Sequence, residues 1–202
     1  MLYLDDFTTG KEISLGHYTV SEKEIIDFAK DYDFQDFHTD PEAAKRSVFG
    51  GLIASGWHTA GICMKLICQA FMTQTACNGS PGIQDLKWLK PVRPGDTLTG
   101  FVRVTGQLPS KSKPDRGASL QHWALQNQDG DTVFCADVTV LMMRKPQPVE
   151  QAPVEQAAAA MAAAGQADAH PTSPDRAELE KWRAQAQSLW FNDGSCTGGK
   201  SE

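Results

Sequence analysis

An aspartate, a histidine and a glycine-rich segment follow one another closely in the first third of the sequence. Asp33 and His38 stand five positions apart. A carboxylate and an imidazole are side chains that can hold one water molecule and move its proton. Ser55 and Gly56 then begin a long apolar segment, where the first backbone N–H groups of a helix would lack partners. Because free N–H groups stabilise negative charge on an oxygen, the residues predict a site that activates water beside a polarised carbonyl.

Segment 33–56 resembles the hydratase motif of MaoC-like dehydratases, the (R)-specific enoyl-CoA hydratases. In that motif an Asp and a His five positions apart precede a Phe-Gly-Gly-x-Ile-Ala-x-Gly run. The matching residues here are Asp33, His38, Phe49, Gly50, Gly51, Ile53, Ala54 and Gly56. Family members usually carry Asn-Pro between the acid and the histidine, whereas this chain has Gln35-Asp36. Residues 87–98 also resemble the family, so the likeness covers roughly residues 5–145.

The resemblance implies a hydro-lyase that acts on 2-enoyl or (R)-3-hydroxyacyl thioesters, without a metal or redox cofactor. It implies that Asp33 and His38 hold and activate the water, with their division of labour left open, and that the Gly56 N–H polarises the thioester carbonyl. An acyl-CoA is the expected substrate, and at least a homodimer is the expected assembly. Two alternatives stay open: a hotdog acyl-CoA thioesterase, and a non-catalytic acyl-CoA-binding hotdog protein.

Taken singly, the candidate residues have simpler explanations. Asp33 could be an exposed residue at the end of a helix, and His38 an ordinary loop histidine. Ser55 lacks the full G-x-S-x-G context of a nucleophile and is better explained as a helix cap. The other histidines share no metal-ligand spacing, so no metal site is expected among them: His17, His58, His122 and His170.

Helix signals surround the candidate residues. Residues 21–24 form a capping box, with Val20 and Ile25 as a hydrophobic staple, and predict a helix that ends at Asp33. Asp40 or Thr39 before Pro41 predicts a short helix directly after His38. The segment from about 56 to 71 is apolar on nearly every face, so we expect it to be wrapped by other elements.

Strand signals supply the wrapping. Strands are predicted at 13–20, where Gly16 interrupts the run, and at 83–90, 97–108, 118–127 and 132–143. Asp129-Gly130 marks a hairpin between the last two. The pattern together with the resemblance predicts an α+β hotdog fold, a curved antiparallel sheet wrapped around a long buried helix.

Bulk properties limit the class of protein. A chain of 202 residues with 41% hydrophobic content suits one domain with an appendage. A net charge of −6 argues against nucleic acid or an anionic membrane as the main partner. The five cysteines form no CxxC pair, the amino terminus is acidic, and no apolar run could cross a bilayer. We therefore expect a cytoplasmic protein.

Composition divides the chain into three parts. Residues 1–145 form the expected hotdog domain, and 146–172 a Pro- and Ala-rich linker. Residues 173–202 are expected to form an amphipathic helix, with Trp182 and Trp190 on one side, followed by a disordered tail.

Overall fold

The computed structural model describes residues 1–146. The predicted C-terminal helix and all but the first residue of the predicted linker lie outside them. The described elements are η1 (Leu4–Asp6), β1 (Glu12–Thr19), α1 (Glu22–Tyr32), α2 (Asp36–Thr39), α3 (Pro41–Lys45), α4 (Gly56–Ala70), η2 (Met72–Gln74), β2 (Ile83–Trp88), β3 (Thr97–Pro109), β4 (Arg116–Gln126) and β5 (Thr132–Met143).

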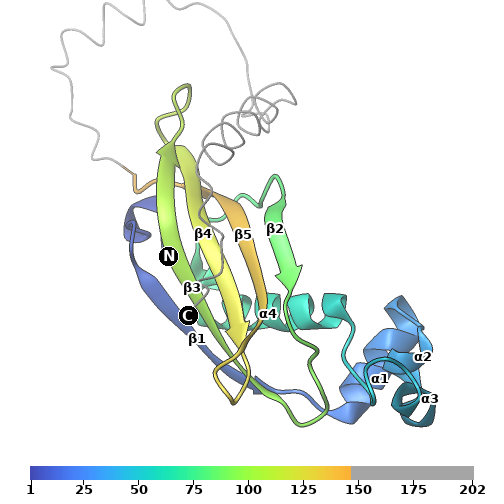
Figure 1. Ribbon diagram of the computed structural model, residues 1–202. Helices are drawn as coiled ribbons and strands as arrows, with labels where there is room; N and C mark the ends of the chain where they lie inside the picture. The colour runs from blue at the N-terminus through green and yellow to red at the C-terminus, as the bar shows by residue number, and fades with distance from the viewer. Residues whose placement is uncertain (147–202) are drawn as a thin grey trace, which may run out of the picture. The chain divides into compact units, whose positions relative to one another are not determined.

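The five strands form one sheet in the order β1-β3-β4-β5-β2, with every neighbouring pair antiparallel. The sheet curves, and α4 lies across one of its faces (Figure 1). Alternate residues of the strands, such as Val102 and Trp123, share a core cluster with Ile62 and Leu66 of α4. This α+β arrangement is the hotdog fold, as predicted.

The sheet covers only one side of α4. Ile62, Leu66 and Ile67 are buried, but Trp57 is 61% exposed and Met64 39%. The predicted long central helix is present, and the side of it that faces away from the sheet is partly exposed in the single chain. The sheet ends at β2, the short edge strand, and does not extend around the far side of the helix.

A bulge interrupts β1 where the sequence suggested a break. The register between β1 and β3 shifts between Ser14 and Gly16, and Gly16 has a φ of 78°. Glycine adopts this left-handed conformation without the penalty that a Cβ would impose. The strand therefore bends there and stays paired on both sides.

The helices α1, α2 and α3 group together beside one end of α4 (Figure 1). The capping box of α1 is present, with the Ser21 side chain accepting from the Glu24 N–H, and Val20 and Ile25 are fully buried. Asp40 caps α3 by accepting from the N–H groups of Glu42 and Ala43. These N-caps set where α1 and α3 begin, and so where the residues between the helices lie.

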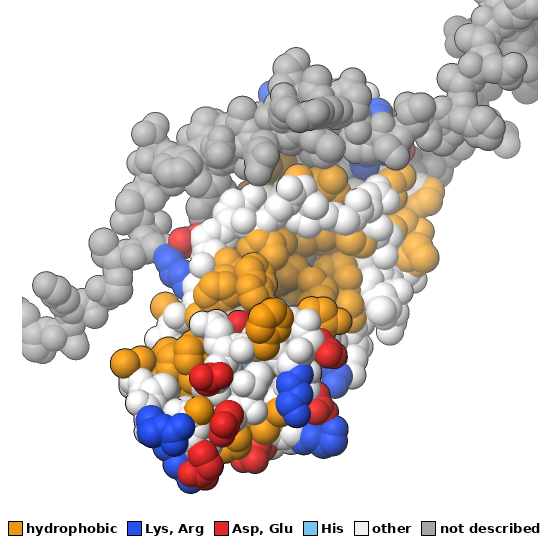
Figure 2. Space-filling model, turned by 90° about the vertical axis from the view of Figure 1, so that its right-hand side faces the viewer, with side chains coloured by type: hydrophobic (Ala, Val, Ile, Leu, Met, Phe, Trp, Pro, Cys, Tyr) orange, Lys and Arg blue, Asp and Glu red, His pale blue; other side chains and the backbone are white. Residues whose placement is uncertain are grey.

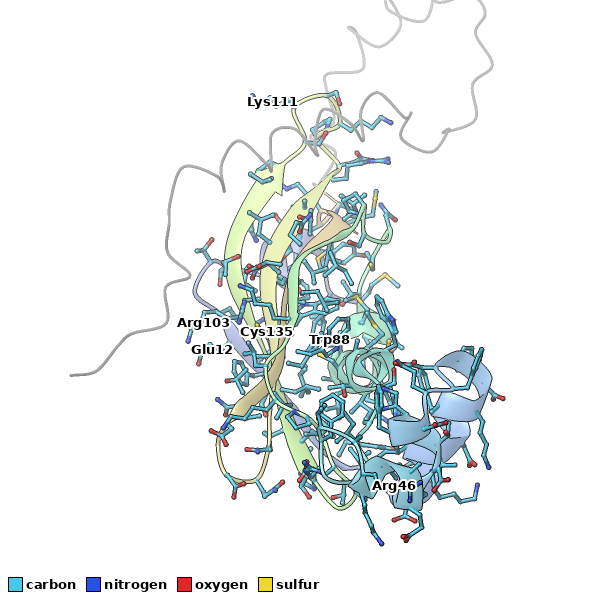
Figure 3. All side chains as sticks on the ribbon, turned by 45° about the vertical axis from the view of Figure 1, so that its right-hand side comes forward. Glu12, Arg46, Trp88, Arg103, Lys111 and Cys135 are labelled. Carbon is cyan, nitrogen blue, oxygen red and sulfur yellow. The ribbon has the colours of Figure 1, made fainter. Side chains whose placement is uncertain are left out.

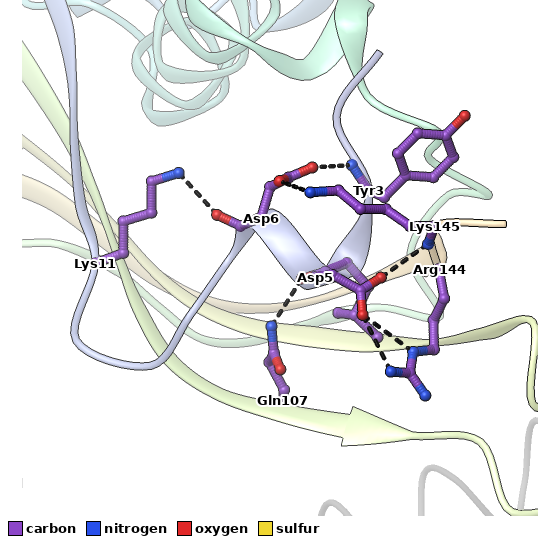
Figure 4. Close-up of polar contacts among 8 residues, drawn as sticks. Tyr3, Asp5, Asp6, Lys11, Gln107, Arg144 and Lys145 are labelled. Atoms are coloured by element: carbon purple, nitrogen blue, oxygen red, sulfur yellow. Dashed lines mark hydrogen bonds and ion pairs between the residues drawn. The ribbon is translucent and has the colours of Figure 1, made fainter. Parts of the chain in front are cut away.

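A polar network joins the start of the described chain to its end (Figure 4). The Asp5 carboxylate accepts from the Arg144 guanidinium at 3.0 Å and from the Lys145 backbone N–H at 2.8 Å. Asp6 pairs with the Lys145 ammonium at 2.5 Å, and Gln107 donates to the carbonyl of Leu4. The first residues are thereby fixed against β3 and the end of β5.

Candidate active site

Three helix ends bring the candidate residues together. Asp33 is the C-cap of α1, and its N–H donates to the carbonyl of Ala29. His38 lies inside α2, a short helix that was not predicted from the sequence, rather than in a loop. Gly56 is the first residue of α4. Asp33, His38 and Gly56 all line one cavity.

The His38 ring is held in one orientation. The side chain is buried, and its Nδ1 lies 2.8 Å from the backbone carbonyl oxygen of Ile53. Because a carbonyl oxygen only accepts hydrogen bonds, Nδ1 must carry a proton. In the neutral ring the other nitrogen, Nε2, then has a free lone pair. That nitrogen faces the Asp33 carboxylate, 3.4 Å from Oδ2.

Both oxygens of the Asp33 carboxylate receive hydrogen bonds. The Ser55 hydroxyl donates to Oδ2 at 2.7 Å, and the Gln35 amide donates to Oδ1 at 2.8 Å. Burial raises the pKa of this carboxyl, but the hydrogen bonds from Ser55 and Gln35 and the nearby His38 outweigh it, so the pKa lies below its ordinary value. Asp33 is therefore ionised at neutral pH.

The separation of Asp33 and His38 suits a single donor that lies to one side and contacts both acceptors. At 3.4 Å, Oδ2 and Nε2 lie beyond the usual length of a direct hydrogen bond. When Asp33 is ionised and the His38 ring is neutral, both atoms accept. A water molecule has two O–H groups and can donate one to each. The pair can thus hold a water with both of its protons directed at bases.

Ser55 makes a second contact besides the cap of α4. It caps α4 as predicted, its Oγ accepting from the Trp57 N–H at 3.2 Å. Its hydroxyl also donates a hydrogen bond to Asp33, which lies 22 positions earlier in the chain. Nothing in the sequence pattern indicates this long-range contact. Ser55 therefore links the start of α4 to the orientation of the carboxylate.

The first turn of α4 presents a free backbone donor. The Gly56 N–H has no acceptor among residues 1–146. The Ser55 hydroxyl oxygen accepts instead from the next backbone N–H, that of Trp57. The positive end of the helix dipole lies at the same place. An oxygen that carries developing negative charge would be stabilised there.

The cavity has a polar end and apolar walls. Its volume is about 490 Å³. Asp33, His38 and Gly56 lie at its polar end, while aromatic and aliphatic side chains form much of the rest: Phe37, Phe49, Ile53, Trp57, Trp88 and Leu89. Figure 2 shows a hollow in this face bordered by hydrophobic side chains, with the charged side chains gathered on the part below it. Such a slot suits an apolar chain that carries one polar reacting group.

The other candidate residues lie elsewhere. His122 pairs with Asp137 across β4 and β5, and His58 stacks on Phe28 between α4 and α1. Within residues 1–146, no group of three or more His, Cys, Asp or Glu side chains is arranged to hold a metal ion. His170 lies outside the described residues.

Comparison with known proteins identifies the family. The model of the MaoC like domain matches residues 6–122, more than half of the chain. The chain belongs to the MaoC-like dehydratase family. This MaoC-like chain is 32% identical over 142 residues to the uncharacterised protein YdeM of Bacillus subtilis, covering 70% of the chain and 99% of YdeM.

Two further relatives come from Rhodospirillum rubrum. An (R)-specific enoyl-CoA hydratase is 36% identical over 111 residues, which cover 54% of the MaoC-like chain and 74% of the relative. The crystal structure of a MaoC-like dehydratase superposes with a TM-score of 0.68 at 38% identity, covering 73% of this chain and all of that one. Among the residues described, no helix of the MaoC-like chain is long and apolar enough to cross a membrane.

Proposed function

We propose that this protein is a hydro-lyase that adds water to a 2-enoyl thioester, or removes it from an (R)-3-hydroxyacyl thioester. The observation that carries the proposal is the pair of acceptors, Asp33 Oδ2 and His38 Nε2, which face each other 3.4 Å apart in one cavity. A water bound to both atoms would lie beside the slot in which a substrate must bind.

Asp33 and His38 handle the proton of this water. As the water oxygen bonds to C3 of the enoyl group, one water proton passes to the pair, and the electrons of the double bond move towards the thioester carbonyl. The resulting enolate then takes a proton from the pair at C2. One water is consumed, and no oxidant, reductant or metal takes part in the balance.

The Gly56 N–H stabilises the enolate oxygen. It is a free donor at the positive end of α4, and it lines the same cavity as the two bases. Because charge on the carbonyl oxygen grows only as the reaction proceeds, such a donor favours the transition state over the bound substrate. Loss of a comparable donor costs about 3 kcal/mol of transition-state stabilisation.

We propose an acyl-CoA as the substrate. The relative from Rhodospirillum rubrum bears the name of an (R)-specific enoyl-CoA hydratase. The apolar walls of the cavity, including Phe37 and Phe49, fit an acyl chain better than a polar substrate.

We also propose that the chain forms a homodimer through α4 and β2. Trp57, Met64, Ile83 and Leu89 are exposed large hydrophobic residues on or beside these two elements. β2 is in addition an open edge of the sheet. An unpaired edge strand and exposed apolar residues are features that association covers. Trp57 and Leu89 also line the cavity, so the active sites would lie near the subunit boundary.

Turnover of crotonyl-CoA tests the activity. The purified chain is mixed with crotonyl-CoA, and loss of the enoyl absorbance is followed for the wild type and for Asp33→Asn. We expect hydration by the wild type and a rate at least about 100-fold lower for the variant. Asp36→Asn is the matched control, because this aspartate is exposed and does not line the cavity. Wild-type rates from Asp33→Asn, or no turnover of short or long enoyl chains, would refute the proposal.

A second assay distinguishes the hydratase from a thioesterase and from a non-catalytic binding protein. A thiol-reactive dye reports free CoA, which a thioesterase releases and a hydratase does not. Binding of acyl-CoA with neither reaction would indicate a non-catalytic binding protein.

A further inference from the structure

Trp88 covers the backbone of Gly56. A Cβ added to Gly56 would lie 2.6 Å from Cε2 of the Trp88 indole, 2.8 Å from Nε1 and 2.9 Å from Cδ2. These distances are too short for any side chain at position 56. The two residues are 32 positions apart, and Trp88 reaches towards α4 from the edge of the sheet (Figure 3). The Trp88 ring can lie this close to α4 because residue 56 is a glycine.

A hydrogen bond also joins Trp88 to Gly56 and fixes the orientation of the indole. The indole Nε1–H donates to the carbonyl oxygen of Gly56 at 2.7 Å. That carbonyl belongs to the same peptide group as the Trp57 N–H, which Ser55 Oγ accepts. The peptide after Gly56 is thus held at its oxygen and at its nitrogen. Since glycine has no Cβ to restrict its dihedral angles, these contacts limit how Gly56 turns its own N–H.

The backbone of Trp88 is itself anchored at both ends. Trp88 pairs with Phe134 in the β2–β5 ladder, and the next N–H, from Leu89, donates to the carbonyl of Val133 at 2.8 Å. A few residues later, the carbonyl of Val92 accepts from the Ala54 N–H at 2.8 Å, directly before α4. The indole is therefore presented by a segment that is tied to the sheet and to the start of the helix.

Trp88 is also open to the cavity. It is 45% exposed and lines the cavity, and its ring meets that of Trp57 edge to face, with centroids 5.4 Å apart. A tryptophan that served the core alone would be expected to be mostly buried. Its position at the polar end of the cavity, over the free donor, points to a role at the reacting group.

We propose that Trp88 is a positioning residue that clamps the first turn of α4 and aims the Gly56 N–H at the thioester oxygen. The inference rests on the proposed function, which it extends to a residue outside the segment of the acid and the histidine. Trp88 acts through Gly56 and does not exchange a proton with the substrate.

Trp88→Phe tests the hydrogen bond. Phenylalanine keeps an aromatic ring over Gly56 but has no N–H to donate. We expect kcat for crotonyl-CoA to fall about three- to tenfold, the change that loss of one hydrogen bond allows. KM and the pH profile should stay unchanged, because Asp33 and His38 are untouched. Lys23→Ala, an exposed change on α1 that does not line the cavity, is the control and should keep the wild-type kcat.

A second experiment does not depend on turnover. Urea unfolding is measured for the wild type, Gly56→Ala, Trp88→Ala and the double variant. We expect Gly56→Ala to lower the unfolding midpoint when Trp88 is present, because the new methyl group collides with the indole. In the Trp88→Ala background the same change should have little effect, since the collision is gone.

The two experiments distinguish a failure of the proposed function from a failure of the proposed role of Trp88. If the wild type does not hydrate enoyl-CoA, the proposed function falls, while the unfolding cycle still decides whether Trp88 clamps Gly56. Wild-type kcat in Trp88→Phe, or an equal loss of stability on Gly56→Ala in both backgrounds, would overturn the clamp.

Discussion

The Asp33 carboxylate and the His38 imidazole face each other with Oδ2 and Nε2 3.4 Å apart. The bond from His38 Nδ1 to the Ile53 carbonyl and the bond from Ser55 to Asp33 decide which atoms are left to accept a proton. The site is therefore set by hydrogen bonds from residues that do not themselves exchange protons with a substrate.

If one water is shared, the two bases should act as a unit. We expect Asp33→Asn and His38→Asn each to lower kcat by about 10²- to 10⁴-fold. The double variant should lose little more than the more damaging single change, because either one already removes the shared water. Steady-state rates of the four proteins measure this. Losses that multiply in the double variant would show that the two side chains work separately.

Ser55 should tune the acidity of Asp33. Its hydroxyl stabilises the ionised carboxylate, so Ser55→Ala should raise the pKa of Asp33. The acid limb of kcat/KM would then move to higher pH. The variant also loses the α4 cap, at about 1 kcal/mol of folding stability.

Ser21→Ala is the control for Ser55→Ala, since it removes the corresponding cap of α1 and does not contact Asp33. We expect a similar loss of stability from it with an unchanged pH profile. A profile that moved equally in both variants would contradict a specific effect of Ser55.

His58 should make folding stability depend on pH. Burial lowers its pKa from the ordinary value of 6.5, more than the Glu24 carboxylate raises it, and Lys65 lowers it further. Its Nδ1 is buried and has no hydrogen-bond partner among residues 1–146. Because the folded-state pKa lies below the unfolded one, the His58 contribution is complete above pH 6.5 and is lost as pH falls below it.

Urea unfolding between about pH 5 and pH 8 measures the His58 effect. In His58→Gln, which cannot be protonated, the fall in unfolding free energy below pH 6.5 should be smaller than in the wild type. An identical pH dependence in the two proteins would assign the effect to other groups.

The exposed face of α4 should govern association. Met64 is 39% exposed and does not line the cavity, so Met64→Lys places a charge on the proposed interface without touching the site. We expect the sedimentation coefficient to change from that of a dimer to that of a monomer. Lys23→Met on α1 is the control for a change of surface charge elsewhere. A Met64→Lys protein that sediments like the wild type would place the interface on another surface.

The elements that local patterns define were predicted well. The capping box at Ser21, the Asp40 cap before Pro41 and the hairpin at Gly130, where φ is 82°, each depend on residues within one turn of one another. The strands follow from two-residue alternation and differ from the prediction by at most a few residues. Local propensity and the tertiary structure agree in these places.

The contacts that complete the site could not be predicted. Ser55 reaches Asp33 across 22 positions, and Trp88 covers Gly56 across 32. Such contacts depend on how the sheet and the helices pack, which periodicity does not encode. The exposure of one side of α4 could not be predicted either. The apolar composition of the helix does not reveal that the sheet ends at β2.

The network of Asp5 and Asp6 with Arg144 and Lys145 brings both ends of the described unit together. Domains whose ends lie close tolerate a change in the order of their segments. A short peptide joining Met1 to Pro146 would therefore allow circular permutation, with new termini in the polar turn between β3 and β4. The residues of the candidate site lie on other elements and would keep their original connections.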